Sequence, residues 1–328
     1  MSVPHDRPVL LDQIGGPIAA VLTDYAQQVR VIEGNRDNAE PWQTAGVDIL
    51  LTGPSPAWAK APSSPPASWR EGPRWVQIAS AGIDGFPKWL TEGRIVTCGR
   101  GDAATPIAEY VISALLHRER QVDALHPATP QEWTDAIAPF RQNPVTGTLH
   151  GRALGLAGYG AIGRAIASRA RAFGMHVRVL RRSAWTETDE GVEPVSSLRE
   201  LFRQSDHLVL AMPLTAETRG IVNDELLSHA KAGLHLVNVA RGALVDQEAL
   251  LHALDSGRPA FATLDVTTPE PLPAGHPLYT HPRVRLTPHI SWVGPDVRAN
   301  LAQRIRTNLS RFLRNEPLLD VIDPERGY

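Results

Sequence analysis

The stretch Leu154-Gly155-Leu156-Ala157-Gly158-Tyr159-Gly160-Ala161-Ile162-Gly163-Arg164 joins a short apolar run to three glycines and then to a helical pattern. Residues 152–157 are typical of a buried strand, and residues 161–173 carry apolar side chains at helical spacing. In such a strand, turn and helix, the first glycine permits a tight turn, the second lets the backbone approach a pyrophosphate, and the third lets the helix pack against its strand. The stretch therefore predicts a dinucleotide site with the pyrophosphate at a helix N-terminus, formed by Gly158, Tyr159, Gly160, Ala161, Ile162 and Gly163.

The residues after the next predicted strand indicate which dinucleotide is bound. That strand covers residues 177–180, and its end would face the adenosine ribose. A site for NAD usually places Asp or Glu there, whereas this chain has Arg181, Arg182 and Ser183. Two guanidinium groups and a hydroxyl suit a 2′-phosphate, although arginines at a strand end can also be simply solvated. The combination favours NADP(H) over NAD(H) as the cofactor.

Length and composition indicate an ordinary globular chain of two domains. The 328 residues exceed a typical single core, and 42% of them are hydrophobic. The 33 Lys and Arg residues nearly balance the 35 Asp and Glu residues, so no basic excess points to nucleic acid or to an anionic membrane. The single cysteine, Cys98, cannot form an intramolecular disulfide, and the first residues show no signal-peptide pattern. We therefore expect a cytoplasmic protein with a small-molecule partner and with neither a nucleic-acid nor a membrane partner.

The N-terminal part of the chain predicts one α/β unit. Residues 53–73 are rich in proline, serine and tryptophan, which predicts a surface loop with one short helical turn. Thr105-Pro106 then predicts a helix start, with the Thr105 hydroxyl at the cap, and this helix marks the domain boundary. Short apolar segments before the boundary predict strands at residues 9–11, 29–32, 47–51 and 75–79.

The chain beyond this helix predicts a second α/β unit. Residues 127–144 are interpreted as irregular and polar, and after the glycine motif strands alternate with helices, which predicts a doubly wound parallel sheet. A last amphipathic helix within residues 295–315 is expected to return to the first domain. The predicted domains are a discontinuous one of residues 1–104 plus 295–328 and a cofactor domain of residues 105–294. The predicted strands cover residues 207–212, 234–240, 260–266 and 284–287, and the predicted helices cover residues 224–230 and 246–256.

Three candidate catalytic residues follow predicted strands, at the end where ligands bind in open α/β sheets: Arg241, Glu270 and His289. Hydride transfer to a 2-oxo acid needs a cation that holds the acid and a proton donor for the carbonyl oxygen, and these roles suit Arg241 and His289. A carboxylate such as Glu270, bonded to the second imidazole nitrogen, would favour the protonated histidine. Each residue alone has an ordinary structural explanation, as a capping arginine, a loop acid or a structural histidine. Their joint placement is what predicts an active site.

Several further motifs follow one another along the chain in a recognisable order. With the glycine motif, they resemble the D-isomer-specific 2-hydroxyacid dehydrogenases, and within that family the glyoxylate and hydroxypyruvate reductases. The resemblance extends over nearly the whole chain. The segments that carry it are Met212-Pro213-Leu214-Thr215-Ala216-Glu217-Thr218, Asn238-Val239-Ala240-Arg241-Gly242-Ala243-Leu244-Val245-Asp246, Leu264-Asp265-Val266, Glu270-Pro271-Leu272-Pro273 and Thr287-Pro288-His289.

The resemblance implies two doubly wound parallel-sheet domains of the α/β class, a flavodoxin-like substrate domain and a Rossmann cofactor domain, with a cleft between them. It also implies a homodimer formed through the cofactor domains, and Arg241, Glu270 and His289 as the catalytic set without a metal. The backbone N–H groups of Ser80, Ala81 and Gly82 would bind the substrate together with Arg241 and His289. The cofactor would further contact Thr105, Met212, Pro213, Thr218, Ala240 and Asp265, the last near the nicotinamide.

One residue departs from the family pattern. Small residues usually follow the catalytic histidine, whereas here Ser291-Trp292 follows His289. Trp292 is therefore a candidate substrate-binding residue that narrows the acyl pocket, and packing of its ring in a domain interface is the alternative.

We expect an NAD(P)-dependent enzyme that acts on CH–OH donors, in which NADPH reduces a small 2-oxo acid of the glyoxylate or hydroxypyruvate type to the D-2-hydroxy acid. Two alternatives stay open at this point. One is NAD(P)-dependent oxidation of another small anion such as phosphite, since Glu270 argues only against formate. The other is a non-catalytic, cofactor-sensing protein that resembles the corepressor branch of the family.

Overall fold

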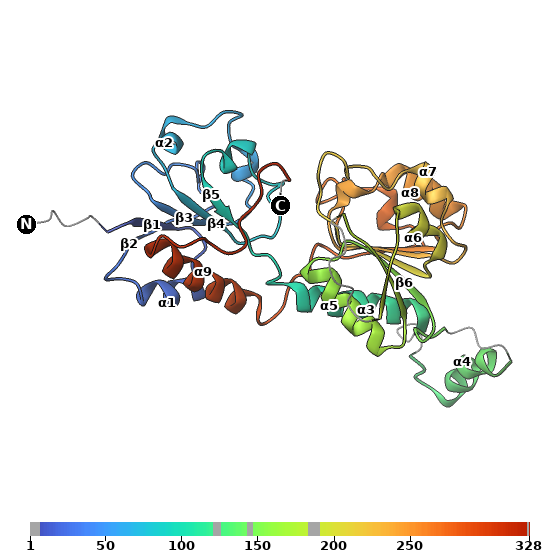
Figure 1. Cartoon of the computed structure of the whole chain (residues 1–328). Coiled ribbons are helices and arrows are strands. Elements are labelled where there is room, and N and C mark those ends of the chain that lie inside the picture. The colour runs from blue at the N-terminus through green and yellow to red at the C-terminus, as the bar shows by residue number, and fades with distance from the viewer. Residues whose placement is uncertain (1–6, 121–125, 143–146, 183–190, 327) are drawn as a thin grey trace, which may run out of the picture. The chain divides into compact units, whose positions relative to one another are not determined.

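The computed structural model describes residues 7–120, 126–142, 147–182, 191–326 and 328. The chain forms two compact units, unit 1 from residues 1–103 and 294–328 and unit 2 from residues 104–293. Each unit is built around one parallel sheet, of five strands in unit 1 and seven in unit 2 (Figure 1). The prediction of two parallel-sheet α/β domains is confirmed.

The sheet of unit 1 has the strand order β2-β1-β3-β4-β5, in which every neighbouring pair is parallel. This is the flavodoxin-like order. The two central strands β3 and β4 are buried along their whole length, as expected of continuous apolar runs in a parallel sheet. The strands are β1 (Val9–Asp12), β2 (Arg30–Glu33), β3 (Ile49–Thr52), β4 (Trp75–Ile78) and β5 (Ile95–Thr97).

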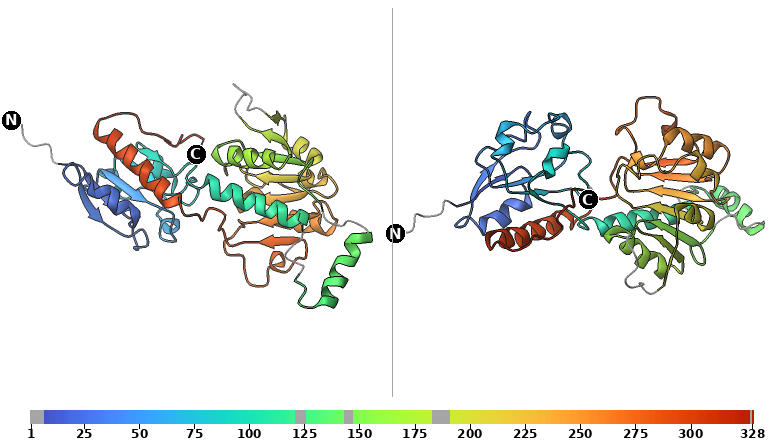
Figure 2. Two further views of the ribbon diagram at one scale, coloured as in Figure 1. Left: turned by 90° about the horizontal axis from the view of Figure 1, so that it is seen from below. Right: turned by 45° about the horizontal axis from the view of Figure 1, so that its top comes forward.

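One face of this sheet is covered by helices from the two ends of the chain, α1 (Pro17–Thr23) and α9 (Val297–Leu313) (Figure 1, Figure 2). The apolar stripe of α9 includes Leu301, Ile305 and Leu309, which pack into one buried cluster with side chains of α1 and of the strands. The C-terminal segment therefore completes a core that the N-terminal segment begins.

The opposite face of the same sheet is covered by tryptophans, and here the sequence prediction was wrong. The indoles of Trp58 and Trp69 are fully buried, with ring centroids 6.0 Å apart, in a segment that we expected to be a surface loop. Trp58 lies in a 3-10 turn (Trp58–Lys60), and Trp69 lies in α2 (Ala67–Arg70). The proline-rich segment follows the sheet surface closely enough to bury its aromatic rings, because this face would otherwise be exposed to water.

The sheet of unit 2 has the strand order β12-β11-β10-β9-β6-β7-β8 and is also parallel throughout. Read outward from β6, this is the dinucleotide-binding order with one extra strand, β12, at its edge. The strands are β6 (Ala153–Ala157), β7 (His176–Leu180), β8 (Val192–Pro194), β9 (His207–Leu210), β10 (His235–Asn238), β11 (Phe261–Leu264) and β12 (Val284–Leu286).

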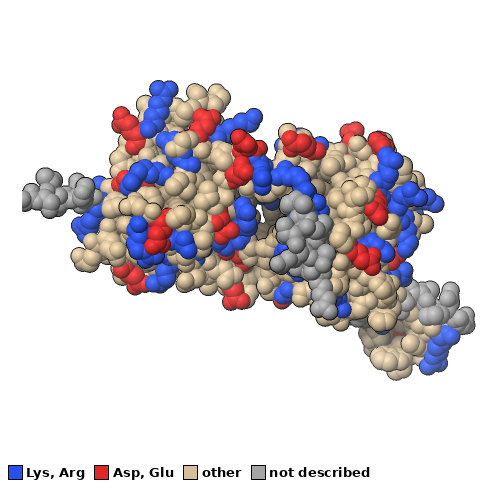
Figure 3. Space-filling model, viewed as in Figure 1, with Lys and Arg blue, Asp and Glu red and all other residues tan. Residues whose placement is uncertain are grey.

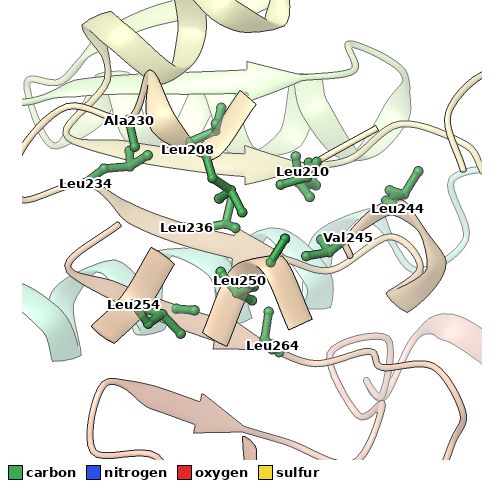
Figure 4. Packing of buried hydrophobic residues seen from close by; sticks show 14 of the residues in the cluster. Leu208, Leu210, Ala230, Leu234, Leu236, Leu244, Val245, Leu250, Leu254 and Leu264 are labelled. Atoms are coloured by element: carbon green, nitrogen blue, oxygen red, sulfur yellow. The ribbon is translucent and has the colours of Figure 1, made fainter. Parts of the chain in front are cut away.

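Helices cover both faces of this second sheet (Figure 1). On one face α3 (Ala104–Arg120) packs beside α5 (Ala161–Ala172), and the other face carries α6 (Leu198–Gln204), α7 (Asp224–Ser228) and α8 (Gln247–Asp255). Figure 4 shows the core under α8, where leucines of the helix meet leucines of the strands. This packing holds the carboxyl ends of the strands, and the loops that leave them, on a rigid support.

Two predictions about the start of unit 2 need correction. The first helix begins at Ala104, so Thr105 lies inside α3 and is not its cap. Residues 130–142, expected to be irregular, form α4 (Pro130–Gln142). A capping-box sequence explains α4, because Thr129 Oγ1 accepts the Glu132 N–H at 3.1 Å, while Glu132 Oε2 reaches past the cap residue and accepts the Ala128 N–H at 2.7 Å. Pro130 is then tolerated at the helix start.

Basic and acidic side chains are interspersed on the face shown in Figure 3. Among the helices described, none is both long and apolar enough to cross a membrane. Cys98 is a free, fully buried thiol.

Candidate active site

The glycine motif forms a tight turn between β6 and α5. Gly158 has φ +110°, and a Cβ there would lie 2.5 Å from the Ala211 carbonyl oxygen. A Cβ on Gly163 would lie 2.3 Å from the Gly158 carbonyl oxygen, whereas one on Gly160 would meet nothing within 4 Å. Two of the glycines are thus required by close backbone packing, and the third leaves open space above the turn.

The start of α5 has the properties of an anion site. Its N-cap, Gly160, provides no side-chain hydrogen bond to the first turn. Ala161, Ile162 and Gly163 begin a helix of 12 residues, and the first backbone N–H groups of a helix carry a partial positive charge. The buried Tyr159 ring lies below the Arg164 guanidinium, 4.6 Å from its central carbon to the ring centroid. These residues fit the pyrophosphate of a dinucleotide.

The other predicted cofactor residues lie mostly in loops at the carboxyl ends of the strands. Arg181 and Arg182 directly follow β7, and Ser183 lies outside the described residues. The Thr218 hydroxyl donates to the Pro213 carbonyl at 2.9 Å and so closes the loop that begins at Met212, after β9. Ala240 and Asp265 follow β10 and β11, whereas Thr105 is the exposed second residue of α3.

The three candidate catalytic residues leave three adjacent strands, since Arg241 follows β10, Glu270 follows β11 and His289 follows β12. His289 Nδ1 lies 2.9 Å from Glu270 Oε2. The positive charge of Arg241 acts on both partners. The fold therefore brings together a guanidinium, a carboxylate and an imidazole within one unit.

The electrostatics of the pair favour a charged histidine. The hydrogen bond to Glu270 raises the pKa of His289, against burial and the charge of Arg241, which both lower it. For Glu270, burial would raise the pKa, but the hydrogen bonds from His289 and from the Thr267 N–H outweigh burial and lower it. Glu270 is therefore ionised at neutral pH, with its pKa lowered, and His289 holds its proton to higher pH than an ordinary histidine does.

Backbone packing fixes the loops that carry these side chains. Thr267 donates its N–H to Glu270 Oε1 at 3.0 Å, and the Gln247 side chain of α8 makes two hydrogen bonds to the backbone of Thr268. A Cβ on Gly242 would lie 2.0 Å from the carbonyl carbon of Thr267, so only glycine lets the loop after Arg241 pack directly on the loop that leads to Glu270.

Asn238 is a site residue that sequence reasoning missed. Its side chain is almost fully buried at the end of β10, where it donates to the Arg241 carbonyl at 2.8 Å and accepts the Ala240 N–H at 3.1 Å. The amide thus sets the backbone from which Arg241 projects. A buried asparagine at the end of a predicted strand was the available signal, because a buried amide needs partners.

Comparison with known proteins identifies the family. Residues 112–291 match the family model described as D-isomer specific 2-hydroxyacid dehydrogenase, NAD binding domain. This chain belongs to that family. It is an oxidoreductase of the kind that acts on CH–OH donors, and the predicted family is confirmed.

Two relatives illustrate the similarity of this chain to other proteins of the family. Glyoxylate/hydroxypyruvate reductase A of Serratia proteamaculans (strain 568) is 32% identical over 231 residues, which are 69% of this chain and 69% of the relative. D-3-phosphoglycerate dehydrogenase of Bacillus subtilis (strain 168) is 37% identical over 176 residues, which are 53% of this chain and 33% of the relative.

Solved structures of the family match almost the whole chain. A D-isomer specific 2-hydroxyacid dehydrogenase from Xanthobacter autotrophicus Py2, in complex with NADPH and MES, is 29% identical with a TM-score of 0.78, over 98% of this chain and 100% of that one. The NADPH-dependent glyoxylate/hydroxypyruvate reductase from Sinorhizobium meliloti, in complex with NADP and sulfate, is 26% identical with a TM-score of 0.75, over the same shares of the two chains.

Within this dehydrogenase, the remaining predicted substrate residues lie in both units. Ser80, Ala81 and Gly82 follow β4 in unit 1, where the Ser80 hydroxyl donates to the Gly82 carbonyl at 2.7 Å. Trp292 belongs to unit 2, and its indole N–H donates to the His289 carbonyl at 2.9 Å while the residue stays 46% exposed. Trp292 is thus attached to the histidine loop itself.

Proposed function

We propose that this dehydrogenase reduces a small 2-oxo acid of the glyoxylate or hydroxypyruvate type to the D-2-hydroxy acid, with NADPH preferred over NADH. The observation that carries the proposal is the His289–Glu270 pair, 2.9 Å apart and influenced by the charge of Arg241. The similarity to the reductases of Serratia proteamaculans and Sinorhizobium meliloti supports the same substrate class.

A nicotinamide cofactor held by the glycine turn would supply the hydride, that is, two electrons and a proton, that the carbonyl carbon of the 2-oxo acid needs. His289 supplies the second proton. Its Nδ1–H donates to the Glu270 carboxylate, so the proton on Nε2 is the one available to the carbonyl oxygen. After transfer, the neutral imidazole keeps its orientation because Glu270 still accepts from Nδ1.

Arg241 would hold the substrate carboxylate and polarise the carbonyl group. A guanidinium offers parallel donors that match a carboxylate, and its charge does not depend on pH. Gly242 and Asn238 fix the backbone on either side of this arginine, so that its position is set before substrate binds.

The decisive experiment measures the initial rate of NADPH consumption, beside NADH, with four 2-oxo acids: glyoxylate, hydroxypyruvate, pyruvate and a phenyl-substituted acid. We expect turnover with the small acids and a higher kcat/KM with NADPH than with NADH. Tight NADPH binding without turnover on any of the four would overturn the reductase proposal.

The cofactor preference is assigned to Arg181. Arg181→Asp removes a cation where a 2′-phosphate would lie, so the KM for NADPH should rise about 10- to 100-fold while that for NADH changes little. Arg203→Asp, at an exposed position of α6, is the matched control. An equal loss with both cofactors in the Arg181 variant would contradict the assignment.

Trp292 is proposed to limit the size of the substrate. Its indole is held on the His289 carbonyl, so a smaller side chain would enlarge the space beside the proton donor. Trp292→Ala should therefore raise kcat/KM for the phenyl-substituted acid relative to glyoxylate. Trp292→Phe keeps a ring and should preserve the wild-type ranking of substrates.

We further propose that the enzyme acts as a homodimer. The exposed helix α4 offers apolar side chains for such a contact, since Trp133 is 68% exposed and Ile137, one turn later, is 37% exposed. Light scattering after size exclusion should give twice the chain mass, and a monomer at all concentrations would rule the dimer out.

A further inference from the structure

The backbone of His289 has φ +54°, a left-handed conformation that residues other than glycine adopt rarely. A histidine keeps such a backbone only when its neighbours hold it there. In this structure the holding group is Asp265, whose carboxylate is 1% exposed. Its Oδ1 accepts the Ile290 N–H and its Oδ2 accepts the Ser291 N–H, both at 2.9 Å, while its backbone carbonyl accepts the His289 N–H at 2.8 Å.

The Asp265 carboxylate is itself fixed by a chain of hydroxyl groups that reaches α3. Thr287 Oγ1 donates to Asp265 Oδ1 at 2.6 Å. Tyr110 Oη lies 2.6 Å from the same Thr287 oxygen. Since the only Thr287 hydroxyl proton already points to Asp265, the tyrosine must be the donor to Thr287. Tyr110 therefore donates a hydrogen bond to Thr287, and Thr287 donates one to Asp265.

We propose that Tyr110 is a positioning residue for His289, which acts through Thr287 and Asp265 to hold the histidine loop in its left-handed conformation. This inference rests on the proposed role of His289 as proton donor and extends it to a residue of α3. The Tyr110 hydroxyl orients the Thr287 hydroxyl, the Thr287 hydroxyl orients the Asp265 carboxylate, and that carboxylate orients the two amides beyond His289.

The proposed proton transfer depends on the distance between the His289 imidazole and the Glu270 carboxylate. The imidazole meets Glu270 at 2.9 Å only while its backbone is held, and Glu270 is the partner that keeps His289 protonated. The charged groups that act on His289 are Glu270, Asp265 and Arg241. Removal of the Tyr110 hydroxyl changes none of these charges, so any change in the proton affinity of His289 reports its position.

The test compares four single variants of the full-length chain. Tyr110→Phe and Thr287→Val interrupt the chain of hydroxyls, Thr287→Ser keeps it, and Tyr25→Phe removes a tyrosine hydroxyl that donates to a backbone carbonyl in unit 1. We expect Tyr110→Phe to lower kcat about fivefold, with Thr287→Val at least as severe, and the KM for NADPH to stay unchanged. Thr287→Ser and Tyr25→Phe should behave as wild type.

A double variant and a titration separate positioning from general damage. Tyr110→Phe combined with Thr287→Val should lose no more kcat than Thr287→Val alone, because both substitutions interrupt the same series of hydrogen bonds to Asp265. In histidine NMR, with the His289 signal identified by its loss in His289→Asn, Tyr110→Phe should lower the pKa of His289, because a loosened loop weakens the hydrogen bond to Glu270.

The outcomes distinguish this inference from the proposed function. Additive losses, or an unchanged kcat and an unchanged His289 pKa in Tyr110→Phe, would overturn the positioning role. If the wild-type protein reduces none of the 2-oxo acids, the proposed function fails, and the NMR titration in the absence of substrate still decides whether Tyr110 positions His289.

Discussion

The described residues of unit 2 form two histidine–glutamate pairs, one at each end of the strands of its sheet. At the carboxyl end, His289 Nδ1 meets Glu270 at 2.9 Å. At the amino end, His207 Nε2 lies 3.2 Å from Glu119 of α3, and His207 Nδ1 faces Nδ1 of His235 at 3.2 Å. His207 and His235 are the first residues of β9 and β10. The same two residue types therefore occur at opposite ends of the same sheet.

The two places differ in burial, and this reverses the behaviour of the imidazole. The His289 side chain is 41% exposed, and its bond to Glu270 raises its pKa. His235 is fully buried, and burial, together with the charges of His207 and Arg118, moves its pKa well below the ordinary value. A buried imidazole such as that of His235 is therefore not suited to acid chemistry at neutral pH. A proton donor must reach water or substrate with one ring nitrogen, as the partly exposed His289 can.

The largest expected effect is the loss of the proposed proton donor. His289→Asn should lower kcat for reduction by about 10²- to 10⁴-fold, with little change in the melting temperature, because the side chain is partly exposed and outside the core. Steady-state kinetics and NADPH fluorescence titration provide the two measurements. His281→Asn, which alters another histidine close to a carboxylate, is the matched control and should keep full activity.

Glu270→Gln comes next and tests the role of charge within the pair. Without the carboxylate, the pKa of His289 should fall, so activity in the reductive direction, which needs the protonated imidazole, should be lost at lower pH than in wild type. At pH 7 we expect a loss in kcat of about 10- to 100-fold. A pH–rate profile identical to that of wild type would contradict this, and Asp255→Asn serves as the control.

At the amino end the expected effect is on stability and not on catalysis. Thr263 Oγ1 lies 2.8 Å from His235 Nε2, and Thr263→Val leaves that buried nitrogen without its partner. The free energy of unfolding should fall by about 1–3 kcal/mol while kcat stays unchanged. Urea denaturation measures the first quantity, and Thr280→Val, at an exposed position, is the control. A large loss of kcat in Thr263→Val without loss of stability would contradict the assignment of a structural role to the amino end of the strands.

The smallest effect is the pH dependence of stability between pH 7 and 5.5. The unfolded chain protonates His235 near the ordinary pKa of about 6.5, whereas in the folded protein complete burial, together with the nearby charges of His207 and Arg118, lowers the pKa of His235 well below that value. The contribution of neutral His235 to the free energy of unfolding is therefore fully present above about pH 6.5. It falls as the pH drops below about 6.5, and the free energy of unfolding is about 1 kcal/mol lower at pH 5.5. His235→Gln should flatten this dependence, and an equal slope in the two proteins would exclude His235 as its source.

Most of the strand positions, though not that of β8, and the catalytic trio could be expected from sequence because each depends on local pattern. Apolar runs bounded by glycine and proline predict parallel strands, and the residue after each strand then falls at the ligand end of the sheet. Arg241, Glu270 and His289 were predicted in this way, and the structure places them in the segments that follow three adjacent strands. Their catalytic roles remain predictions for the experiments above.

What sequence reasoning missed depends on contacts between distant segments. The tryptophans of residues 53–73 are core residues because they cover a sheet whose strands lie elsewhere in the chain. Tyr110 reaches Thr287 across 177 positions of sequence, and no periodicity encodes such a contact. Helix α4 is different, since the capping box from Thr129 to Glu132 is visible in the sequence and outweighs the prolines that suggested a loop.

The order of segments in unit 1 has a consequence for synthesis on the ribosome. Unit 2 is one uninterrupted stretch, residues 104–293, whereas unit 1 needs α9 from the far side of that stretch to cover its sheet. During translation, the whole of unit 2 is therefore made while the apolar face of β1 and α1 is still uncovered. Unit 1 thus begins to form before unit 2 and is completed only after it, so its unfinished apolar face is open to wrong contacts throughout the synthesis of unit 2.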